Sequence, residues 1–99
     1  MSRENGRNGI YFWSGGVARG NVVTLNADDG IHASDGVLIV DDDVVDNGNG
    51  PTDDGIECAA GCSVRGNAVR ANDGLGLNLG ATSAYSGNTI TLNAAGTVA

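Results

Sequence analysis

The chain has 99 residues, of which 40% are apolar, 17 are glycine and one is proline, which suits one turn-rich domain over residues 1–99 with a modest core. Its formal charge is −7, with five arginines, no lysine and twelve acidic residues, so its surface repels phosphate backbones and we expect no nucleic-acid partner. The longest apolar runs, IYFW and VLIV, fall far short of the roughly 20 residues that cross a bilayer, so we expect no membrane insertion.

A repeated pattern covers most of the chain. The motif N-x-[VI]-x-x-N, with aspartate as its first residue in one copy, recurs in steps of 21, 25 and 21 residues from Asn21, Asp42, Asn67 and Asn88. A glycine followed by an apolar residue recurs beside it, at Gly9, Gly30, Gly55 and Gly74. A unit of about 20 residues cannot bury its own apolar face. We therefore expect stacked coils, one starting near each of these glycines.

In chain order, each coil is expected to contain three short strands separated by turns. The first strand follows the Gly-apolar pair, the second precedes the Gly-Asn turn, and the third follows that turn. Alternation with a period of two gives the first strand two inward columns: Ile10, Ile31, Ile56 and Leu75, then Phe12, Ala33, Cys58 and Leu77. The third strand contributes Val23, Val44, Val69 and Ile90. Coils about 4.8 Å apart would join these columns into one core.

The asparagines fit the turns of such a stack. Asparagine tolerates the left-handed backbone of a tight bend, and its amide can donate and accept hydrogen bonds along identical turns. We expect a ladder at the turn after the third strand, formed by Asn26, Asn47, Asn72 and Asn93.

These residues also give the chain a resemblance to a known family. The turn Gly66-Asn67 and the strand start Asp54-Gly55-Ile56 resemble those of the right-handed parallel β-helix proteins, the pectate-lyase-like solenoids. The resemblance covers nearly the whole chain and implies an all-β, right-handed parallel β-helix of about four coils. It implies no single function, because this fold hosts lyases, hydrolases, epimerases, binding proteins and phage tailspikes.

By analogy with that family, the connection from the third strand to the next first strand is extended once, over residues 47–54, which accounts for the step of 25. In enzymes of the family such loops wall a ligand groove along the first-strand face. Residues 1–8 and 94–99 offer no amphipathic helix or charged lid to cover the terminal coils, and solenoids need caps. We therefore expect either an uncapped fragment of a longer β-helix or a module that stacks end to end on another β-helix segment.

The outward side chains of the first strand form the candidate ligand surface. One outward column is expected to hold Tyr11, His32, Glu57 and Gly76, and the next Trp13, Ser34, Ala59 and Asn78. Aromatic faces stack on the C–H faces of sugars, while a carboxylate and an imidazole can hydrogen-bond to hydroxyls. The predicted ligand-binding residues are Tyr11, Trp13, His32 and Glu57. Two simpler interpretations stay open: an aromatic cluster that covers an end coil or mediates stacking, and a plain cross-strand pair of His32 with Glu57.

Catalysis has less support in the sequence. General acid/base chemistry needs two groups with opposed pKa values around one bond. The candidates are His32 and Glu57, together with the flanking-turn residues Asp28, Asp29, Asp53 and Asp54. Pectate-lyase-like enzymes, however, combine acidic calcium ligands with an arginine or lysine base on the groove face. Lysine is absent here, and Arg19, Arg65 and Arg70 fall in the second and third strands. We assign no catalytic residue and favour a non-enzymatic role.

An acidic turn offers a candidate metal site. Four carboxylates fall within six residues, at Asp41, Asp42, Asp43 and Asp46. Calcium takes six to eight oxygen ligands, and adjacent aspartates in a bend can supply several of them. The alternative is a solvated acidic turn, because the alternating aspartates and glycine of an EF-hand loop are missing.

Cys58 and Cys62 are spaced too widely for a C-x-x-C redox pair, and a single histidine leaves no zinc set. Both cysteines are expected to face inward across the first corner of the third coil. They form either a disulfide, which would indicate an oxidising compartment, or two buried free thiols.

These features together predict a carbohydrate-binding or surface-stalk module of a larger secreted or cell-surface protein, with polysaccharide as its partner. The alternatives are a polysaccharide lyase or hydrolase that acts on the first-strand face, and a purely structural spacer. The extracellular or cell-surface location rests on the resemblance, because residues 1–10 contain no segment that could serve as a signal peptide.

Overall fold

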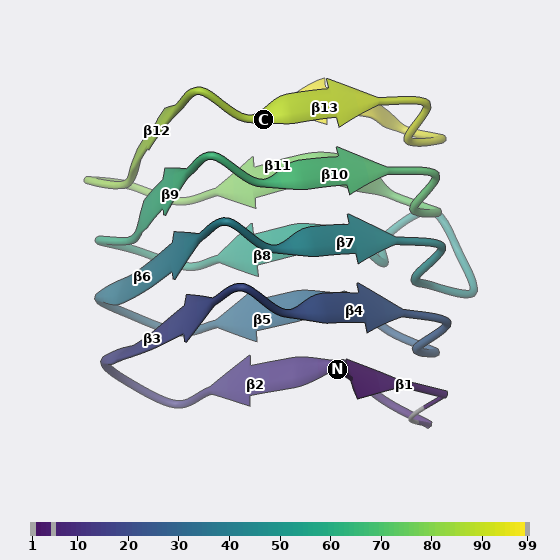
Figure 1. Ribbon diagram of the computed structural model, residues 1–99, viewed down its shortest axis with the longest axis horizontal. Coiled ribbons are helices and arrows are strands. Elements are labelled where there is room, and N and C mark those ends of the chain that lie inside the picture. Colours follow the sequence, from purple (N-terminus) through teal and green to yellow (C-terminus); the bar gives the residue numbers. More distant parts are fainter. Residues whose placement is uncertain (1, 5, 99) are drawn as a thin grey trace.

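The computed structural model describes residues 2–4 and 6–98, and in that range its regular elements are all strands (Figure 1). They form three parallel sheets. The first-strand sheet contains β2 (Ile10–Phe12), β5 (Ile31–Ala33), β8 (Ile56–Cys58), β11 (Leu75–Leu79) and β14 (Gly96–Val98). The second-strand sheet contains β3 (Gly16–Arg19), β6 (Val37–Val40), β9 (Ser63–Arg65) and β12 (Ala84–Ser86). The third-strand sheet contains β1 (Ser2–Arg3), β4 (Val22–Thr24), β7 (Asp43–Val45), β10 (Ala68–Arg70) and β13 (Thr89–Thr91).

The pairing of these strands makes the chain a solenoid. Each strand pairs in parallel with the strand three places later, so β2 pairs with β5 and β5 with β8. Three strands therefore complete one turn, and the turns lie one above another (Figure 1). The predicted all-β parallel solenoid of about four coils is confirmed. The right-handed sense and the pectate-lyase-like family stay predictions.

The apolar side chains of all three sheets meet inside the coils. The inward columns expected for the first and third strands are buried in the central coils, where Ile31, Ile56, Val44 and Val69 have no exposed surface. The second-strand sheet adds Ala18, Ile39 and Val64, which lie opposite one another in register. Identical positions of successive coils thus stack into one continuous core, which is how units too small to fold alone become stable.

Asparagine side chains link the coils at two corners. At the corner after the third strand, the Nδ2 and backbone N of Asn47 both donate to Oδ1 of Asn72, at 3.0 Å each, and the same Nδ2 donates to the Val23 carbonyl at 3.0 Å. Asn26 and Asn72 repeat the bonds to the next asparagine. The predicted ladder of Asn26, Asn47, Asn72 and Asn93 is therefore present. A second ladder at the Gly-Asn corner consists of Asn21, Asp42, Asn67 and Asn88.

The expected conformation of the asparagines was wrong by one position. The left-handed residue of each corner directly precedes the ladder residue: Leu25, Asp46, Ala71 and Leu92 have φ between 56° and 58°. At the Gly-Asn corner the preceding Gly20, Asp41, Gly66 and Gly87 are left-handed in the same way. The ladder residue itself therefore contributes its side-chain hydrogen bonds, and the residue before it supplies the bend; that residue is a glycine at three of the Gly-Asn corners, where the left-handed backbone carries no strain.

The register of the fourth coil also differs from expectation. Leu77, rather than Leu75, lies opposite Ile56, and Leu79, rather than Leu77, lies opposite Cys58. The glycine that continues the column of Gly9, Gly30 and Gly55 is consequently Gly76 and not Gly74, because the Gly55 amide donates to the Leu75 carbonyl as a parallel ladder requires. The sequence DGLGLNLG contains two Gly-Leu pairs, and the second one keeps the step of 21 residues.

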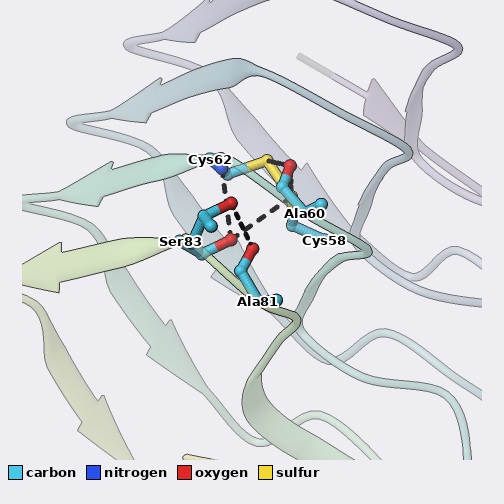
Figure 2. Close-up of a disulfide and its surroundings, with 6 residues drawn as sticks. Cys58, Ala60, Cys62, Ala81 and Ser83 are labelled. Carbon is cyan, nitrogen blue, oxygen red and sulfur yellow. Dashed lines mark hydrogen bonds between the residues drawn. A yellow bond between two sulfur atoms is a disulfide. The ribbon is translucent and has the colours of Figure 1, made fainter.

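A disulfide joins Cys58 and Cys62 across the corner between β8 and β9 (Figure 2). The Cα atoms are 6.4 Å apart, and both side chains are buried. The next coil anchors this corner, because the Cys62 amide donates to the Ser83 hydroxyl at 3.1 Å and the Gly61 amide donates to the Ala81 carbonyl at 3.1 Å.

The extended connection of residues 47–54 joins β7 to β8 and projects from the stack on the right of Figure 1. Its turn is closed by the Asp53 amide, which donates to the Gly50 carbonyl at 3.1 Å. The Gly74 amide of the next coil donates to the Asp53 carbonyl. The loop is therefore fixed to the solenoid at the corner that leads into the first-strand sheet.

Candidate functional site

One outward column of the first-strand sheet brings together most of the predicted ligand residues. Tyr11 lies opposite His32, and His32 lies opposite Glu57. The fourth member is Asn78 and not the expected Gly76, because of the shifted register of β11. At about 4.8 Å per coil, this column of Tyr11, His32, Glu57 and Asn78, called the polar column below, is about 14 Å long.

The aromatic residues lie at the β2 end of the polar column. The rings of Tyr11 and His32 are stacked, with centroids 5.2 Å apart and planes inclined by 13°. Trp13 follows β2, and its ring centroid is 6.3 Å from that of Tyr11. Trp13 is 78% exposed and Tyr11 is 49% exposed, so both rings offer aromatic surface to solvent. In the next coils the position of Trp13 is taken by Ser34, Ala59 and Gly80, so the fourth member of this column is Gly80 and not the expected Asn78.

The imidazole of His32 is held between two carboxylates. Its Nδ1 is 2.8 Å from Oδ2 of Asp29 and 2.9 Å from Oε2 of Glu57. Asp29 is almost fully buried, whereas His32 and Glu57 are each about one-third exposed. The plain cross-strand pair of His32 with Glu57 is therefore part of a cluster of three, and its ligand-type atoms all lie within 4.8 Å of one another.

Asp29 belongs to a third ladder, which lies at the entrance to the first-strand sheet. The Asp29 amide donates to Oδ1 of Asn8 at 3.1 Å, and Oδ1 of Asp29 accepts from the Asp54 amide at 2.6 Å. Oδ1 of Asp54 in turn accepts from the Leu75 amide at 2.7 Å. In each coil the ladder residue stands three positions before the polar-column residue. Its second oxygen therefore faces that column: Oδ2 of Asp54 accepts from Nδ2 of Asn78 at 3.0 Å.

Two carboxylates at the polar column, Glu57 within it and Asp54 beside it, have raised pKa values. Burial, and after it the Asp29 carboxylate, raises the pKa of Glu57 to about 7, although the His32 imidazole opposes the change. Burial also raises the pKa of Asp54, although the hydrogen bonds from Asn78 and from the Leu75 amide oppose that change. Glu57 therefore titrates close to neutrality, where it can accept a proton from a neighbour or donate one to it.

The acidic turn has a different arrangement. Asp42 lies inside the corner ladder, where its Oδ1 accepts from the Asn21 amide at 2.8 Å, while Oδ2 of Asp43 is 4.0 Å from the Arg70 guanidinium. Asp41 and Asp46 are the two exposed members, each with a left-handed backbone. Within residues 2–4 and 6–98, the only group of three donors close enough to hold a metal ion is Asp29, His32 and Glu57. Calcium at the acidic turn stays a prediction.

The surface around the polar column is open. The described residues enclose no pocket, so a ligand would lie on the face of the sheet. The loop of residues 47–54 reaches this face through Asp54, its last residue, which contacts Asn78. None of the described segments is a helix that could cross a membrane.

Comparison with known proteins finds no matching family model, curated protein or solved structure. The interpretation of the site therefore depends on its geometry and chemistry.

Sequence reasoning placed Asp29 and Asp54 only in the turns that flank the first-strand face, and it placed Asn78 in the outward column of Trp13 rather than in that of Glu57. A signal for the two aspartates was present, because Asn8, Asp29, Asp54 and Leu75 follow one another in steps of 21, 25 and 21, the steps of the asparagine ladders. The same steps from Gly55 would have given Gly76, and with it Asn78 as the outward residue of the fourth coil.

Proposed function

We propose that this protein binds polysaccharide on its first-strand face, through Tyr11, Trp13, His32 and Glu57, with Asn78 extending the same strip. The observation that carries the proposal is the solvent-exposed pair of Tyr11 and Trp13, which continues, through the stacking of Tyr11 on His32, into a column of hydrogen-bonding side chains. Aromatic rings cover the apolar faces of sugar rings, and imidazole, carboxylate and amide groups bind their hydroxyls.

The shape of this face favours a polymer over a small ligand. Small ligands are usually enclosed in a cleft or cavity, and the described residues form none. An open strip about 14 Å long would instead accommodate about three sugar units lying along the solenoid axis. A net charge of −7 repels acidic chains, so neutral or cationic polysaccharides are the preferred class and uronates bind only where calcium bridges the charges.

The setting of the module follows from the same features. A buried disulfide is typical of oxidising compartments, which supports an extracellular or cell-surface location. The resemblance to the pectate-lyase-like, right-handed β-helix proteins supports a role in contact with polysaccharide. A lyase or hydrolase activity would need a base and a leaving-group acid on two sides of one bond, whereas His32 and Glu57 contact each other at 2.9 Å, so we propose binding without cleavage.

Calorimetric titration with a panel of neutral, cationic and uronate polysaccharides, with and without calcium, tests the proposal. We expect binding of at least one neutral or cationic polymer, with its length and reducing ends unchanged. Trp13→Ala and His32→Ala should each weaken binding, because one removes a stacking ring and the other a hydrogen-bonding partner.

Val17→Ala is the matched control. Val17 lies in the same coil as Trp13 and is 55% exposed, but it belongs to β3 on the second-strand sheet. Its truncation should leave sugar binding unchanged. If binding survives the double change Trp13→Ala/His32→Ala, this face is not the site. If no polysaccharide binds, a structural spacer becomes the better interpretation.

A further inference from the structure

Two equivalent pairs of side chains on the first-strand face differ in one chemical respect. In the fourth coil, Asn78 reaches back to Asp54, and its amide donates the hydrogen bond that the Asp54 carboxylate accepts. This pair is complementary, with one donor and one acceptor. One coil earlier, the same two positions are occupied by Asp29 and Glu57. Both are carboxylates, so when ionised this pair has two acceptors and no donor.

His32 lies between these two acceptors. Its Nδ1 carries at most one hydrogen, yet it lies within 2.9 Å of an oxygen of each carboxylate. One N–H cannot point at both oxygens, so at least one close contact lacks a well-aligned hydrogen bond. Among the described residues, arginine forms ion pairs only in the pairs Arg3–Glu4 and Arg70–Asp43, so no arginine neutralises Asp29 or Glu57. The cluster therefore concentrates negative charge around a point that a cation could occupy.

We propose that Asp29, His32 and Glu57 form a three-ligand site for a divalent transition-metal ion such as zinc. In the sequence the single histidine offered no zinc set, but the fold places two carboxylates beside it. The ligand atoms would be Oδ2 of Asp29, Nδ1 of His32 and Oε2 of Glu57. On binding, any hydrogen on Nδ1 and any proton on Glu57 pass to solvent, so that Glu57 binds as a carboxylate and the neutral imidazole keeps one hydrogen, on Nε2. The proposal does not rest on the proposed sugar binding.

The distances fit such a site. Zinc lies about 2.0–2.2 Å from imidazole nitrogen and carboxylate oxygen. Two ligands at about 2.1 Å from a tetrahedral zinc ion are about 3.4 Å apart. The observed Nδ1 to oxygen distances of 2.8 and 2.9 Å are shorter than that, so each carboxylate oxygen would move away from Nδ1 by about half an ångström to admit the ion.

The surroundings hold the ligands in place. Oδ1 of Asp29 accepts from the Asp54 amide at 2.6 Å, which leaves Oδ2 directed at the cluster. Asp29 is only 5% exposed, so its side chain has little freedom to turn away. The Tyr11 ring stacks on the imidazole and fixes its plane. Partners of this kind, which orient the ligands without touching the metal, raise metal affinity.

The donor set selects the class of ion. One imidazole nitrogen and two carboxylates suit zinc, manganese, iron, cobalt, nickel and copper. Calcium requires six to eight oxygen ligands, and this cluster offers a nitrogen and few oxygens. We therefore expect zinc to bind and calcium to compete poorly.

Calorimetric titration of the metal-free protein with zinc chloride, without sugar, tests the proposal. We expect one zinc ion per chain. Loss of even an orienting partner can weaken metal binding 10- to 100-fold, so His32→Ala and Glu57→Gln should each weaken it at least about tenfold. His32 is the only histidine, so the nitrogen NMR signals of its ring report the site directly. Zinc should shift the Nδ1 signal strongly and leave the hydrogen on Nε2.

Two control variants locate the ion. Asp46→Asn removes an exposed carboxylate of the acidic turn, and Trp13→Ala removes the sugar-stacking ring, and both should bind zinc as the wild type does. The proposal is wrong if zinc does not bind, or if binding leaves the His32 signals and the affinities of the His32→Ala and Glu57→Gln variants unchanged. If Asp46→Asn weakened zinc binding instead, the ion would lie at the acidic turn. Failure of sugar binding alone would leave zinc binding intact, so the two proposals can be separated.

Discussion

The Asp42→Asn substitution is expected to stabilise the protein at neutral pH. Asp42 is 2% exposed and occupies an asparagine position of the Gly-Asn corner ladder. Its Oδ2 is buried and has no hydrogen-bond partner. In the next coil, the equivalent Nδ2 of Asn67 donates to Asn88 Oδ1 and to the Ile39 carbonyl, each at 3.0 Å. An amide at position 42 would make the same two bonds, to Asn67 Oδ1 and the Ala18 carbonyl.

The expected size follows from these contacts. Two new neutral hydrogen bonds contribute about 1 kcal/mol each, and a buried carboxylate no longer has to lose its hydration. Against this, the two donors of Asn21 lose a charged acceptor, which costs up to about 1 kcal/mol for each bond. We expect a net gain of about 1–2 kcal/mol in the free energy of unfolding. For a domain of this size each kcal/mol raises Tm by roughly 4–8 °C.

The gain should depend on pH. Burial raises the pKa of Asp42 above its ordinary value of 3.8, so the folded state binds its proton more tightly than the unfolded state. Tighter proton binding by folded Asp42 therefore stabilises the wild type in full below pH 3.8, and this stabilisation is lost as the pH rises through the raised pKa of the folded state. At pH values below this pKa, the protonated Asp42 carboxyl can itself donate one hydrogen bond. The advantage of Asp42→Asn should consequently be small at acidic pH and largest at neutral pH.

Urea denaturation followed by circular dichroism, at neutral and at acidic pH, measures this difference. Asp35→Asn is the control, because it removes the same charge from an exposed turn outside the ladders and accounts for any general relief of the net charge of −7. Equal or lower stability of Asp42→Asn at neutral pH, relative to this control, would refute the hydrogen-bond reasoning for the ladder.

Two further predictions concern the corners. Thr82 has a left-handed backbone, with φ 62°, at the corner where the other coils have Gly15, Gly36 and Gly61. Because glycine adopts this conformation without strain, Thr82→Gly should raise the free energy of unfolding by about 1 kcal/mol in the same urea assay. A loss of stability would contradict the strain argument. The disulfide between Cys58 and Cys62 closes a loop with a sequence separation of only 4, so the variant Cys58→Ala/Cys62→Ala should lose only about 2 kcal/mol and remain folded. The wild type denatured without reductant should show no free thiol, and two reactive thiols per chain would contradict the bridge.

The parts of the fold that were predictable are those that the repeat enforces. Residues at equivalent positions of successive coils become neighbours, so the steps of 21, 25 and 21 predict pairs such as Val44 with Val69 and Asn47 with Asn72. The inward and outward alternation of Ile31 and His32 follows from strand geometry alone. Both inferences use only the separation of residues along the chain.

The register of the fourth coil and the residues of the site could not be predicted from the separation of residues along the chain alone. Gly74-Leu75 and Gly76-Leu77 have the same local pattern, and only the coil-to-coil pairing decides between them. Asp28 and Asp29 are adjacent in one turn, and local sequence does not show which of them faces His32. Asp29 does so because it continues the ladder between Asn8 and Asp54, which directs its second oxygen at the imidazole. Local pattern assigns residues to a turn, whereas the contacts across coils determine their directions.

The glycine that opens each first strand is required by space, and this leads to the last prediction. A Cβ on Gly55 would lie 2.5 Å from Val69 Cγ1 and 2.8 Å from both Asn72 Nδ2 and the Gly76 carbonyl oxygen, which are fixed parts of the core, a ladder and the next coil. These atoms cannot move without breaking the hydrogen bonds between coils, so Gly55→Ala should lower the free energy of unfolding by about 1–3 kcal/mol through overpacking. Gly50→Ala is the matched control in the preceding loop, because a Cβ there meets nothing closer than 3.8 Å and the change should cost little. Urea denaturation of the two variants provides the comparison. Similar stabilities would mean that the column of Gly9, Gly30 and Gly55 is not sterically required.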